Sequence, residues 1–272
     1  MKNFLLALLL LFGPGSVLAQ HVTTEVYKKT PTRDLTLRIY TPEGLTERQR
    51  CAAILFFFGG GWSSRNLAQF APHAEALSRR GMVCFVADYR VKTTDGVEPR
   101  VCLSDAKSAL RYVRTHAERL HVDTSRIAAS GGSAGGHLAA AACYCPGFDD
   151  PDDDLSVSCR PTALVLFYPV VDNSGKGYGY ERIKSYFPAF SPIENIKDPV
   201  PTIFFVGSED HLIPPALSRE FQTRCQKAGG RCDLHIFEGK GHGFLNKEED
   251  RARTLEMATD FLVSIGYADA MN

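Results

Sequence analysis

Short apolar runs alternate along the chain with stretches of helical spacing. Residues 52–58 and 82–88 are almost continuously apolar, the pattern of strands that are covered on both faces of a sheet. Residues 35–40 instead alternate between apolar and polar and end before Pro42, as an edge strand does. The other expected strands cover residues 126–130, 163–168, 202–206 and 232–237.

Helical spacing fills the gaps between these runs. One helix is expected over residues 67–80, ending at Gly81, and another over residues 105–120, with Ser104 as its N-cap. Three more helices are expected: one begins at Ala134, the second covers residues 215–228 and the third covers residues 248–265. Alternation of strand and helix predicts an α/β fold with a mostly parallel central sheet and helices on both faces. Active sites of such sheets lie at the carboxyl ends of the strands.

Two regions interrupt this alternation. Residues 143–160 form a cysteine-flanked loop with an acidic run at 149–154, which lacks the carboxylate spacing and the distal glutamate of a calcium-binding EF-hand loop. We therefore expect a solvated loop there. Residues 170–200 are rich in glycine, aromatic residues and proline, and they follow the end of a strand, where they could cover a pocket.

The first residues have the pattern of an export signal. Lys2 precedes an apolar run at residues 4–12, and small residues at 17–19 fit a cleavage site, so residues 1–19 predict a removable signal peptide cut after Ala19. A retained anchor is the alternative, but the run is far shorter than the roughly 20 residues of a membrane-spanning helix, and no later stretch approaches that length. We expect a secreted or periplasmic protein without integral membrane association.

The remaining residues, 20–272, suit one large domain rather than two small ones. The 31 Lys and Arg residues equal the 31 Asp and Glu residues, and no basic stripe occurs. This charge pattern excludes a nucleic-acid partner and favours small or neutral ones. The oligomeric state does not follow from the sequence.

Eight cysteines in an exported chain invite disulfides. The spacing of Cys225 and Cys232 allows a short bridge, and Cys143 or Cys145 could bridge to Cys159, but the pairing stays open. Without paired Cys-x-x-Cys spacings, no metal site is expected.

The glycine-rich turn at residues 131–136 separates the expected strand 126–130 from the helix that starts at Ala134. Such a turn can hold a phosphate or present a catalytic serine. A dinucleotide fingerprint needs glycine where Ser133 stands, and a P-loop needs a lysine that is absent. The pentapeptide at 131–135 does match Gly-x-Ser-x-Gly, which predicts Ser133 as a nucleophile on a strained turn.

A serine nucleophile needs an oxyanion site and a base. Three glycines at 59–61 follow a buried strand directly, so we expect the N–H groups of Gly60 and Gly61, together with that of Ala134, to bind the oxyanion. An ordinary flexible turn is the alternative. His242 lies just beyond the last strand and is the expected base.

The acid that orients this base should follow the preceding strand, where Glu209 and Asp210 are adjacent. We favour Asp210, because three residues separate it from the strand end and allow its carboxylate to turn back toward His242. Side chains expected to contact the substrate, each of which could equally be part of the core, are those of Trp62, His137, Tyr168, His211 and Phe244.

Taken together, the Trp-flanked glycines, Asp88-Tyr-Arg90, the stretch 104–114, the serine turn up to His137, Gly-x-x-Asp210 and Gly-His-Gly-Phe244 resemble α/β-hydrolase esterases of the hormone-sensitive-lipase-like and acetyl-xylan or feruloyl esterase-like groups. The resemblance covers nearly all of residues 25–265. It implies an α/β-hydrolase fold and ester hydrolysis without metal or cofactor. One departure concerns Phe58, which stands where the family's oxyanion motif usually begins with a histidine that braces the loop.

The expected activity is that of a serine carboxylesterase for short acyl groups, acetyl above all, on a polysaccharide or oligosaccharide. Feruloyl esters and simple short-chain esters are alternatives, and residues 170–200 are too small a lid for a triacylglycerol lipase. The alternative of another class is a catalytically silent binding domain with a hydrolase fold. A complete set of serine, base, acid and oxyanion donors argues against it.

Overall fold

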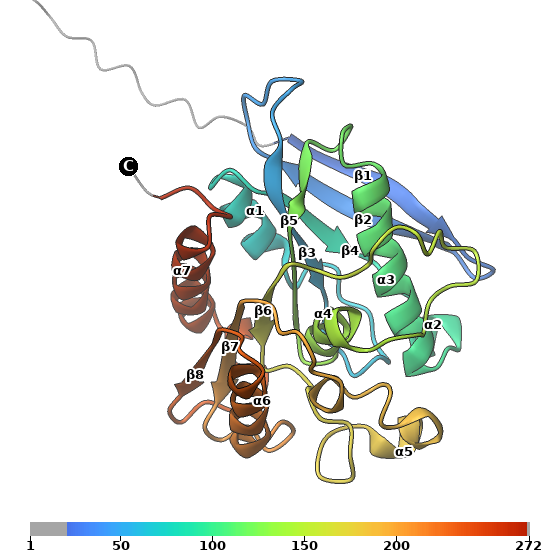
Figure 1. Ribbon diagram of the computed structural model, residues 1–272, viewed down its shortest axis with the longest axis vertical. Coiled ribbons are helices and arrows are strands. Elements are labelled where there is room, and N and C mark those ends of the chain that lie inside the picture. Colours follow the sequence, from blue (N-terminus) through green and yellow to red (C-terminus); the bar gives the residue numbers. More distant parts are fainter. Residues whose placement is uncertain (1–20, 271–272) are drawn as a thin grey trace, which may run out of the picture.

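The computed structural model describes residues 21–270 (Figure 1). The predicted signal peptide, residues 1–19, lies outside the described residues, so the boundary at Ala19 stays a prediction.

A single eight-stranded sheet forms the centre of the molecule, in the order β1-β2-β4-β3-β5-β6-β7-β8. The pairs β1–β2 and β2–β4 are antiparallel and every other pair is parallel, which confirms the mostly parallel sheet. The strands are β1 (His21–Lys29), β2 (Asp34–Thr41), β3 (Cys51–Phe57), β4 (Val83–Ala87), β5 (Val122–Gly132), β6 (Ala163–Phe167), β7 (Thr202–Gly207) and β8 (Cys232–Phe237).

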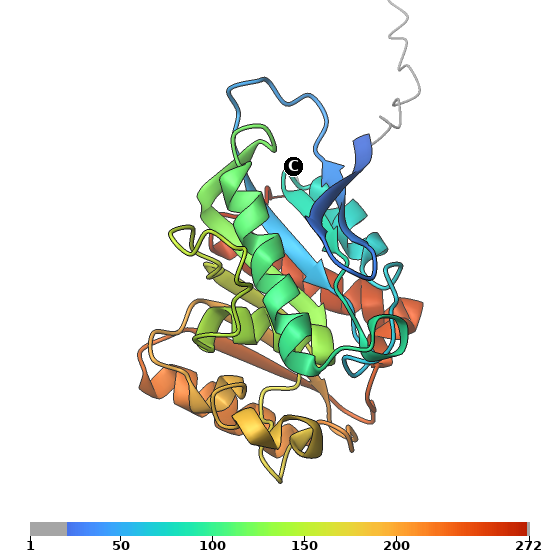
Figure 2. The ribbon, with the colours of Figure 1, turned by 90° about the vertical axis from the view of Figure 1, so that its right-hand side faces the viewer.

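Helices cover both faces of the sheet, as the alternation predicts (Figures 1 and 2). On one face, α1 (Ala71–Ser78) and α7 (Glu248–Ser264) pack onto the sheet and form one core cluster. On the other face, α3 (Pro99–Thr115), α4 (Ala134–Tyr144) and α6 (Pro215–Lys227) form the second cluster. Each core leucine or phenylalanine that becomes fully buried contributes about 1.5–3 kcal/mol to the stability of this arrangement.

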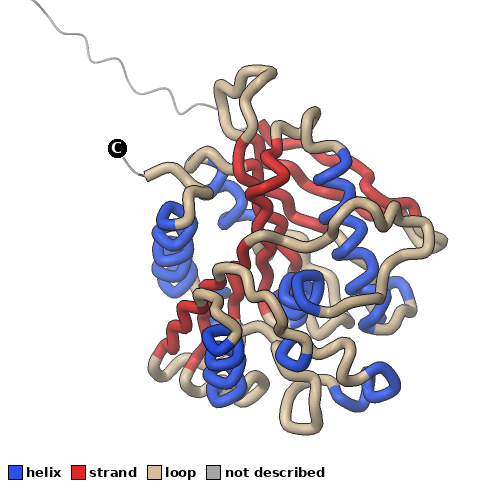
Figure 3. Tube along the Cα trace, in the orientation of Figure 1, coloured by secondary structure: helices blue, strands red, loops and turns tan. Residues whose placement is uncertain are grey.

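The remaining helices are short and belong to the connections (Figure 3). They are α2 (Lys92–Asp95), α5 (Tyr180–Ile183) and the 3₁₀ helices η1 (Lys184–Tyr186), η2 (Pro192–Glu194) and η3 (Phe244–Asn246). The region 170–200 is thus a compact excursion built from two of these turns and α5, inserted between β6 and β7.

Three expectations about the elements are wrong. The strand β1 was not expected, because none of its side chains is fully buried and its pattern carries no strong apolar signal. It pairs with β2, so β2 is not the edge strand. The helix α3 begins at Pro99 rather than after Ser104, because proline suits the first helical turn.

The acidic run is also not a solvated loop throughout. Arg111 on α3 binds Asp149 at 2.6 Å and Asp153 at 2.8 Å, and Lys28 on β1 binds Asp150 at 2.6 Å. These ion pairs fold the loop back onto α3, because its carboxylates neutralise cations that are themselves largely buried. We refer to residues 146–160 as the acidic loop.

All eight cysteines are free thiols in this structure, so the suggested bridges to Cys159 and between Cys225 and Cys232 are not formed. Among residues 21–270, no group of three or more His, Cys, Asp or Glu side chains is arranged to hold a metal ion. None of the helices within the same range has the length and apolar character needed to cross a bilayer.

Candidate active site

Sheet topology brings the predicted loops to one edge. Phe57, the last residue of β3, lies beside Gly131 of β5 in the parallel register, so the loop of three glycines runs next to the serine turn. At the end of the next strands, Gly207 of β7 lies beside Phe237 of β8, which places the Asp210 and His242 loops side by side. The carboxyl ends of four parallel strands thus supply all the predicted groups.

Ser133 occupies the strained turn that the pentapeptide predicts. Its φ of 54° and ψ of −119° lie in a region that residues other than glycine rarely adopt. A Cβ added at Gly135 would overlap the carbonyl oxygens of Phe57 and Phe58, and one at Gly131 would overlap the backbone of Gly135. Glycines are therefore required on both sides of the serine, where the strand and the helix approach each other.

A chain of hydrogen bonds joins the three predicted side chains. His242 Nε2 lies 2.9 Å from Ser133 Oγ, and His242 Nδ1 lies 2.8 Å from Asp210 Oδ2. The second carboxylate oxygen of Asp210 accepts the backbone N–H groups of Leu212 and Ile213, at 3.0 and 2.8 Å. These bonds make Asp210 an acceptor toward His242, so Nδ1 carries the proton and Nε2 is free to accept that of Ser133.

The adjacent Glu209 has a different position. Its side chain is exposed, whereas Asp210 is buried with a relative exposure of 2%. Of the two adjacent carboxylates, Asp210 is therefore the one that lies beside His242. The catalytic roles of the three side chains stay predictions at this point.

The glycine loop has hydrogen bonds to the carbonyl groups of Gly60 and Gly61 but none from the N–H groups of these two residues in the described part of the chain. The carbonyl of Gly60 accepts the N–H groups of Ser63 and Ser64, at 3.0 and 3.1 Å. Within residues 21–270, the N–H groups of Gly60 and Gly61 donate to no protein acceptor, although both glycines line the pocket at Ser133. Ala134 follows the serine as the first residue of α4, where the N–H groups of the opening turn have no partners in their own helix.

Phe58 is supported without the histidine of related motifs. Its ring stacks on that of Tyr89, with ring centroids 4.0 Å apart, and the Tyr89 hydroxyl donates to the Phe58 carbonyl at 2.7 Å. The next N–H group, that of Gly59, donates to Gln69 Oε1 at 2.6 Å. The peptide between Phe58 and Gly59 is therefore held at both ends, which explains how the start of the loop is braced.

A pocket of about 260 Å³ opens at Ser133 and His242. Its walls combine apolar and polar side chains, and only Tyr168 of the five expected substrate contacts is among them. Tyr168 packs edge-on against His242, with ring centroids 4.9 Å apart. No sequence motif pointed to the other side chains of the wall, which are those of Gln69, Tyr178, Leu212, Ile213 and Asn246.

The other four expected contacts lie away from the pocket wall. Trp62 and His137 are buried against each other, with ring centroids 5.1 Å apart, and Phe244 is buried against Phe237. His211 is exposed to solvent. The buried aromatic residues lie near the motifs in the sequence but pack into the core, because large side chains fill the space between α4 and the excursion at residues 170–200.

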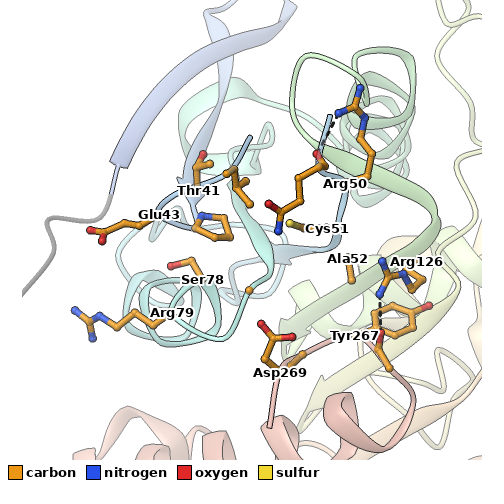
Figure 4. Close-up of a pocket in the computed structure, with 16 residues that line it drawn as sticks. Thr41, Glu43, Arg50, Cys51, Ala52, Ser78, Arg79, Arg126, Tyr267 and Asp269 are labelled. Carbon is orange, nitrogen blue, oxygen red and sulfur yellow. Dashed lines mark hydrogen bonds between the residues drawn. The ribbon is translucent and has the colours of Figure 1, made fainter. Parts of the chain in front are cut away.

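A larger cavity, of about 730 Å³, lies at the opposite edge of the sheet (Figure 4). Its wall includes Cys51 at the start of β3, Arg126 of β5, and Tyr267 and Asp269 near the end of the chain. It contains none of the hydrogen-bonded serine, histidine and aspartate groups described above, so it is separate from the candidate active site.

Comparison with known proteins assigns the family. Residues 37–225, more than half of the chain, match the BD-FAE family. The chain belongs to this family of α/β-hydrolase esterases. The resemblance to α/β-hydrolase esterases, and the fold that it implies, are thereby confirmed.

Esterase 2 of Thermogutta terrifontis has the same fold. Its structure after phosphoramylation by tabun is 43% identical to this chain, with a TM-score of 0.88 over 92% of this chain and 97% of the other. Its propionate-bound structure is 41% identical, with a TM-score of 0.87 over the same shares of the two chains. Most of the described domain is thus shared with an esterase of nearly the same length.

The curated relatives are more distant. An acetylxylan esterase of Xylanibacter ruminicola is 24% identical over 74% of this chain and 42% of its own length. The chain spans about half the length of the curated relatives it matches. The curated relatives include an acetylxylan esterase and a probable carboxylic ester hydrolase, and this chain's own activity and substrates are the subject of the proposal below.

Proposed function

We propose that this protein is a serine carboxylesterase that removes short acyl groups, acetyl above all, from a carbohydrate ester. The observation that carries the proposal is the hydrogen-bonded chain Ser133–His242–Asp210 beside two glycine N–H groups without protein acceptors. A nucleophile, its base and a site for negative charge are the three parts that acyl transfer needs.

The reaction follows from these positions. Ser133 Oγ attacks the ester carbonyl carbon while its proton moves to His242 Nε2, and the carbonyl oxygen becomes negative. The carbon–oxygen bond to the alcohol then breaks, and His242 returns the proton to the leaving alkoxide. Water attacks the acyl-serine with His242 again as base, and collapse of this second intermediate releases the carboxylic acid and restores the serine hydroxyl.

The negative oxygen is stabilised by backbone groups. Gly60, Gly61 and Ala134 supply N–H donors in place of water, and they need no rearrangement during the reaction. Loss of one donor in such a site costs about 100- to 1000-fold in turnover. Asp210 holds the imidazole in the productive tautomer and stabilises the imidazolium that forms.

The size and the chemistry of the pocket support a short acyl group and a polar alcohol. A volume of about 260 Å³, bounded by the rigid ring of Tyr168 and by Ile213, suits acetyl or propionyl better than a long chain. Gln69 and Asn246 offer hydrogen bonds of the kind that sugar hydroxyls make. Similarity to an acetylxylan esterase and to a propionate-bound esterase supports the same choice.

The predicted signal peptide completes the proposal. An exported enzyme would meet acetylated polysaccharide outside the cytoplasm, where the substrate is too large to enter the cell. Processing after Ala19 is tested by sequencing the N-terminus of the protein recovered from culture medium or periplasm. An unprocessed chain in the cytoplasm would contradict export and leave the hydrolase proposal intact.

The first test is loss of the nucleophile. Ser133→Ala is expected to reduce hydrolysis of p-nitrophenyl acetate to the uncatalysed rate, while Ser130→Ala serves as a matched control. The Ser130 hydroxyl is buried three residues earlier without a hydrogen-bond partner, so its removal should leave the activity unchanged. Activity that persists in Ser133→Ala, or no labelling of the wild type by a fluorophosphonate probe, would favour the silent binding domain.

The substrate is tested by a panel. Acetylated xylan and p-nitrophenyl acetate should be hydrolysed with a higher kcat/KM than p-nitrophenyl butyrate and octanoate. Methyl ferulate distinguishes the feruloyl alternative, because its acyl group is far larger than acetate. A higher kcat/KM for the longer chains or for ferulate would replace the acetyl assignment without affecting the role of Ser133.

A further inference from the structure

The excursion between β6 and β7 lies directly on the glycine loop. Gly179 packs on Trp62 so closely that an added Cβ would stand 2.8 Å from the indole ring. Tyr178 lines the pocket, and its hydroxyl would stand 2.8 Å from a Cβ on Gly61. Figure 1 shows α5, the helix that follows these residues, below and to the right of α4.

Arg182, on α5, makes the direct connection. Its Nη1 donates to the carbonyl oxygen of Gly61 at 2.7 Å and approaches Ser63 Oγ at 3.3 Å. The guanidinium lies over the ring of Trp62 at 5.0 Å from its centroid and over the ring of Tyr178 at 5.3 Å. An arginine side chain thus links the glycine loop, the residue that follows it and the pocket wall.

The contact matters because each peptide group is planar, so the Gly61 N–H turns with the Gly60 carbonyl, and the Gly61 carbonyl begins the next peptide of the same turn. The Phe58–Gly59 peptide is held by Tyr89 and Gln69, and the carbonyl of Gly60 is held by Ser63 and Ser64. The carbonyl of Gly61 accepts two hydrogen bonds, one from the Ser63 hydroxyl at 3.2 Å and one from Arg182 at 2.7 Å. Without Arg182, only the longer bond from a neutral hydroxyl holds this carbonyl, on a residue with the widest choice of backbone conformations.

We infer that Arg182 is a positioning residue for the oxyanion site. By holding the Gly61 carbonyl and approaching the Ser63 hydroxyl, it fixes the turn at residues 61–64, whose N–H groups bind the Gly60 carbonyl and thereby orient the Gly61 N–H toward the reacting oxygen. This inference rests on the proposed function. Arg182 touches neither Ser133 nor His242, and it acts only through the loop. A charged donor to a carbonyl makes a stronger hydrogen bond than a neutral one, and the two aromatic rings fix the plane of the guanidinium.

The test compares three variants on a short acyl ester. Arg182→Gln removes the charge, Arg182→Lys keeps it with a different donor geometry, and Lys184→Gln is the matched control on the same segment. Lys184 is exposed and pairs only with the exposed Glu181. We expect Arg182→Gln to lower kcat by about 10- to 100-fold with KM changed less than twofold, because a misplaced donor costs somewhat less than a deleted one. Arg182→Lys should restore part of kcat, and Lys184→Gln should equal the wild type.

A second readout separates positioning from general support of the fold. A trifluoromethyl ketone adds to the active serine and forms an oxyanion, so its affinity should fall in Arg182→Gln by the same factor as kcat/KM. Circular dichroism and thermal denaturation establish that the variants are folded. A folded Arg182→Gln variant with kcat within twofold of the wild type, or with unchanged ketone affinity, overturns the inference. If Arg182→Gln does not fold, the inference is overturned by an Arg182→Lys variant that has both the kcat and the ketone affinity of the wild type.

The outcomes also distinguish this inference from the proposed function. Undiminished activity in Ser133→Ala would remove the function and the inference together. An inactive Ser133→Ala variant combined with a fully active Arg182→Gln variant would remove only the role of Arg182.

Discussion

Two adjacent carboxylates after β7 show how the backbone selects one of them. Asp210 receives the N–H groups of Leu212 and Ile213 on one oxygen and the imidazole of His242 on the other. Glu209 has a longer side chain and points into solvent. The turn that follows the strand therefore fixes the shorter residue as a buried acceptor, and of the two carboxylates only Asp210 lies within hydrogen-bond distance of His242 in the described residues.

Asp210→Asn should lower kcat by about 10⁴-fold, the usual magnitude when an amide favours the wrong tautomer of the histidine. Glu209→Gln is the matched control, since it removes one charge at the neighbouring position, and its kcat should stay within twofold of the wild type. Steady-state kinetics with p-nitrophenyl acetate measure both variants. Similar losses in the two variants would contradict the assignment of Asp210.

The pentapeptide, the strand ends and the order serine, aspartate, histidine were sufficient to locate Ser133, Asp210 and His242 relative to one another. Each of these residues follows a strand of strong apolar character, so its place at the edge of the sheet follows from the fold. Arg182 could not be found in this way. It lies in an excursion without periodicity, and its contact with Gly61 depends on how that excursion folds over the loop.

At the scale of elements, the acidic loop shows the same limit. Its composition is typical of a solvated segment, but α3 begins six residues before the sequence pattern suggests and presents Arg111 and Lys107 to it. Lys107 donates to the carbonyl groups of Cys145 and Gly147. The pairing of charges between distant segments has no local signature, and therefore composition alone misjudged the loop.

Removal of Arg111 should release the acidic loop. Arg111→Gln leaves Asp153 without this cation, leaves Asp149 with the more distant Lys107 at 3.7 Å, and breaks the bond to the Val157 carbonyl. We therefore expect a loss of about 2–4 kcal/mol in the free energy of unfolding. Limited proteolysis within residues 146–160 should become faster. The control Arg119→Gln removes a more exposed pair with Glu25 and should cost less than about 1 kcal/mol. Equal effects of the two changes would contradict a special role for Arg111.

At the scale of the whole molecule, each face of the sheet encloses a buried histidine. His73 lies among Phe56, Phe70 and Phe167 with no partner for either ring nitrogen. On the other face, His137 is fully buried, and its Nε2 donates to the carbonyl of Phe190 at 2.9 Å. Neither takes part in the proposed chemistry. Both histidines make the folded protein less stable in acid. Protonation of a buried, neutral imidazole is unfavourable in the folded chain, so acid favours the unfolded one.

The stability of the protein should consequently fall with pH below about 6.5, the usual pKa of histidine. Burial, with a smaller contribution from the charge of Arg251, lowers the pKa of His73 to about 3. Burial lowers the pKa of His137 to about 4, partly opposed by its bond to the Phe190 carbonyl. Since the unfolded chain binds these protons more readily than the folded one, stability is fully present above pH 6.5 and is lost as the pH falls toward 4.

Each histidine should contribute a slope of about 1.4 kcal/mol per pH unit within this window. Urea unfolding between pH 8 and pH 4.5 measures it. His73→Phe keeps an aromatic ring among the three phenylalanines but removes the titrating group. In this variant, the slope of the unfolding free energy against pH should therefore decrease by the contribution of one histidine. The control His211→Gln changes an exposed histidine and should retain the whole slope. A wild-type slope in His73→Phe would show that His73 is protonated as easily in the folded chain as in the unfolded one, and that its apolar surroundings do not shift its pKa.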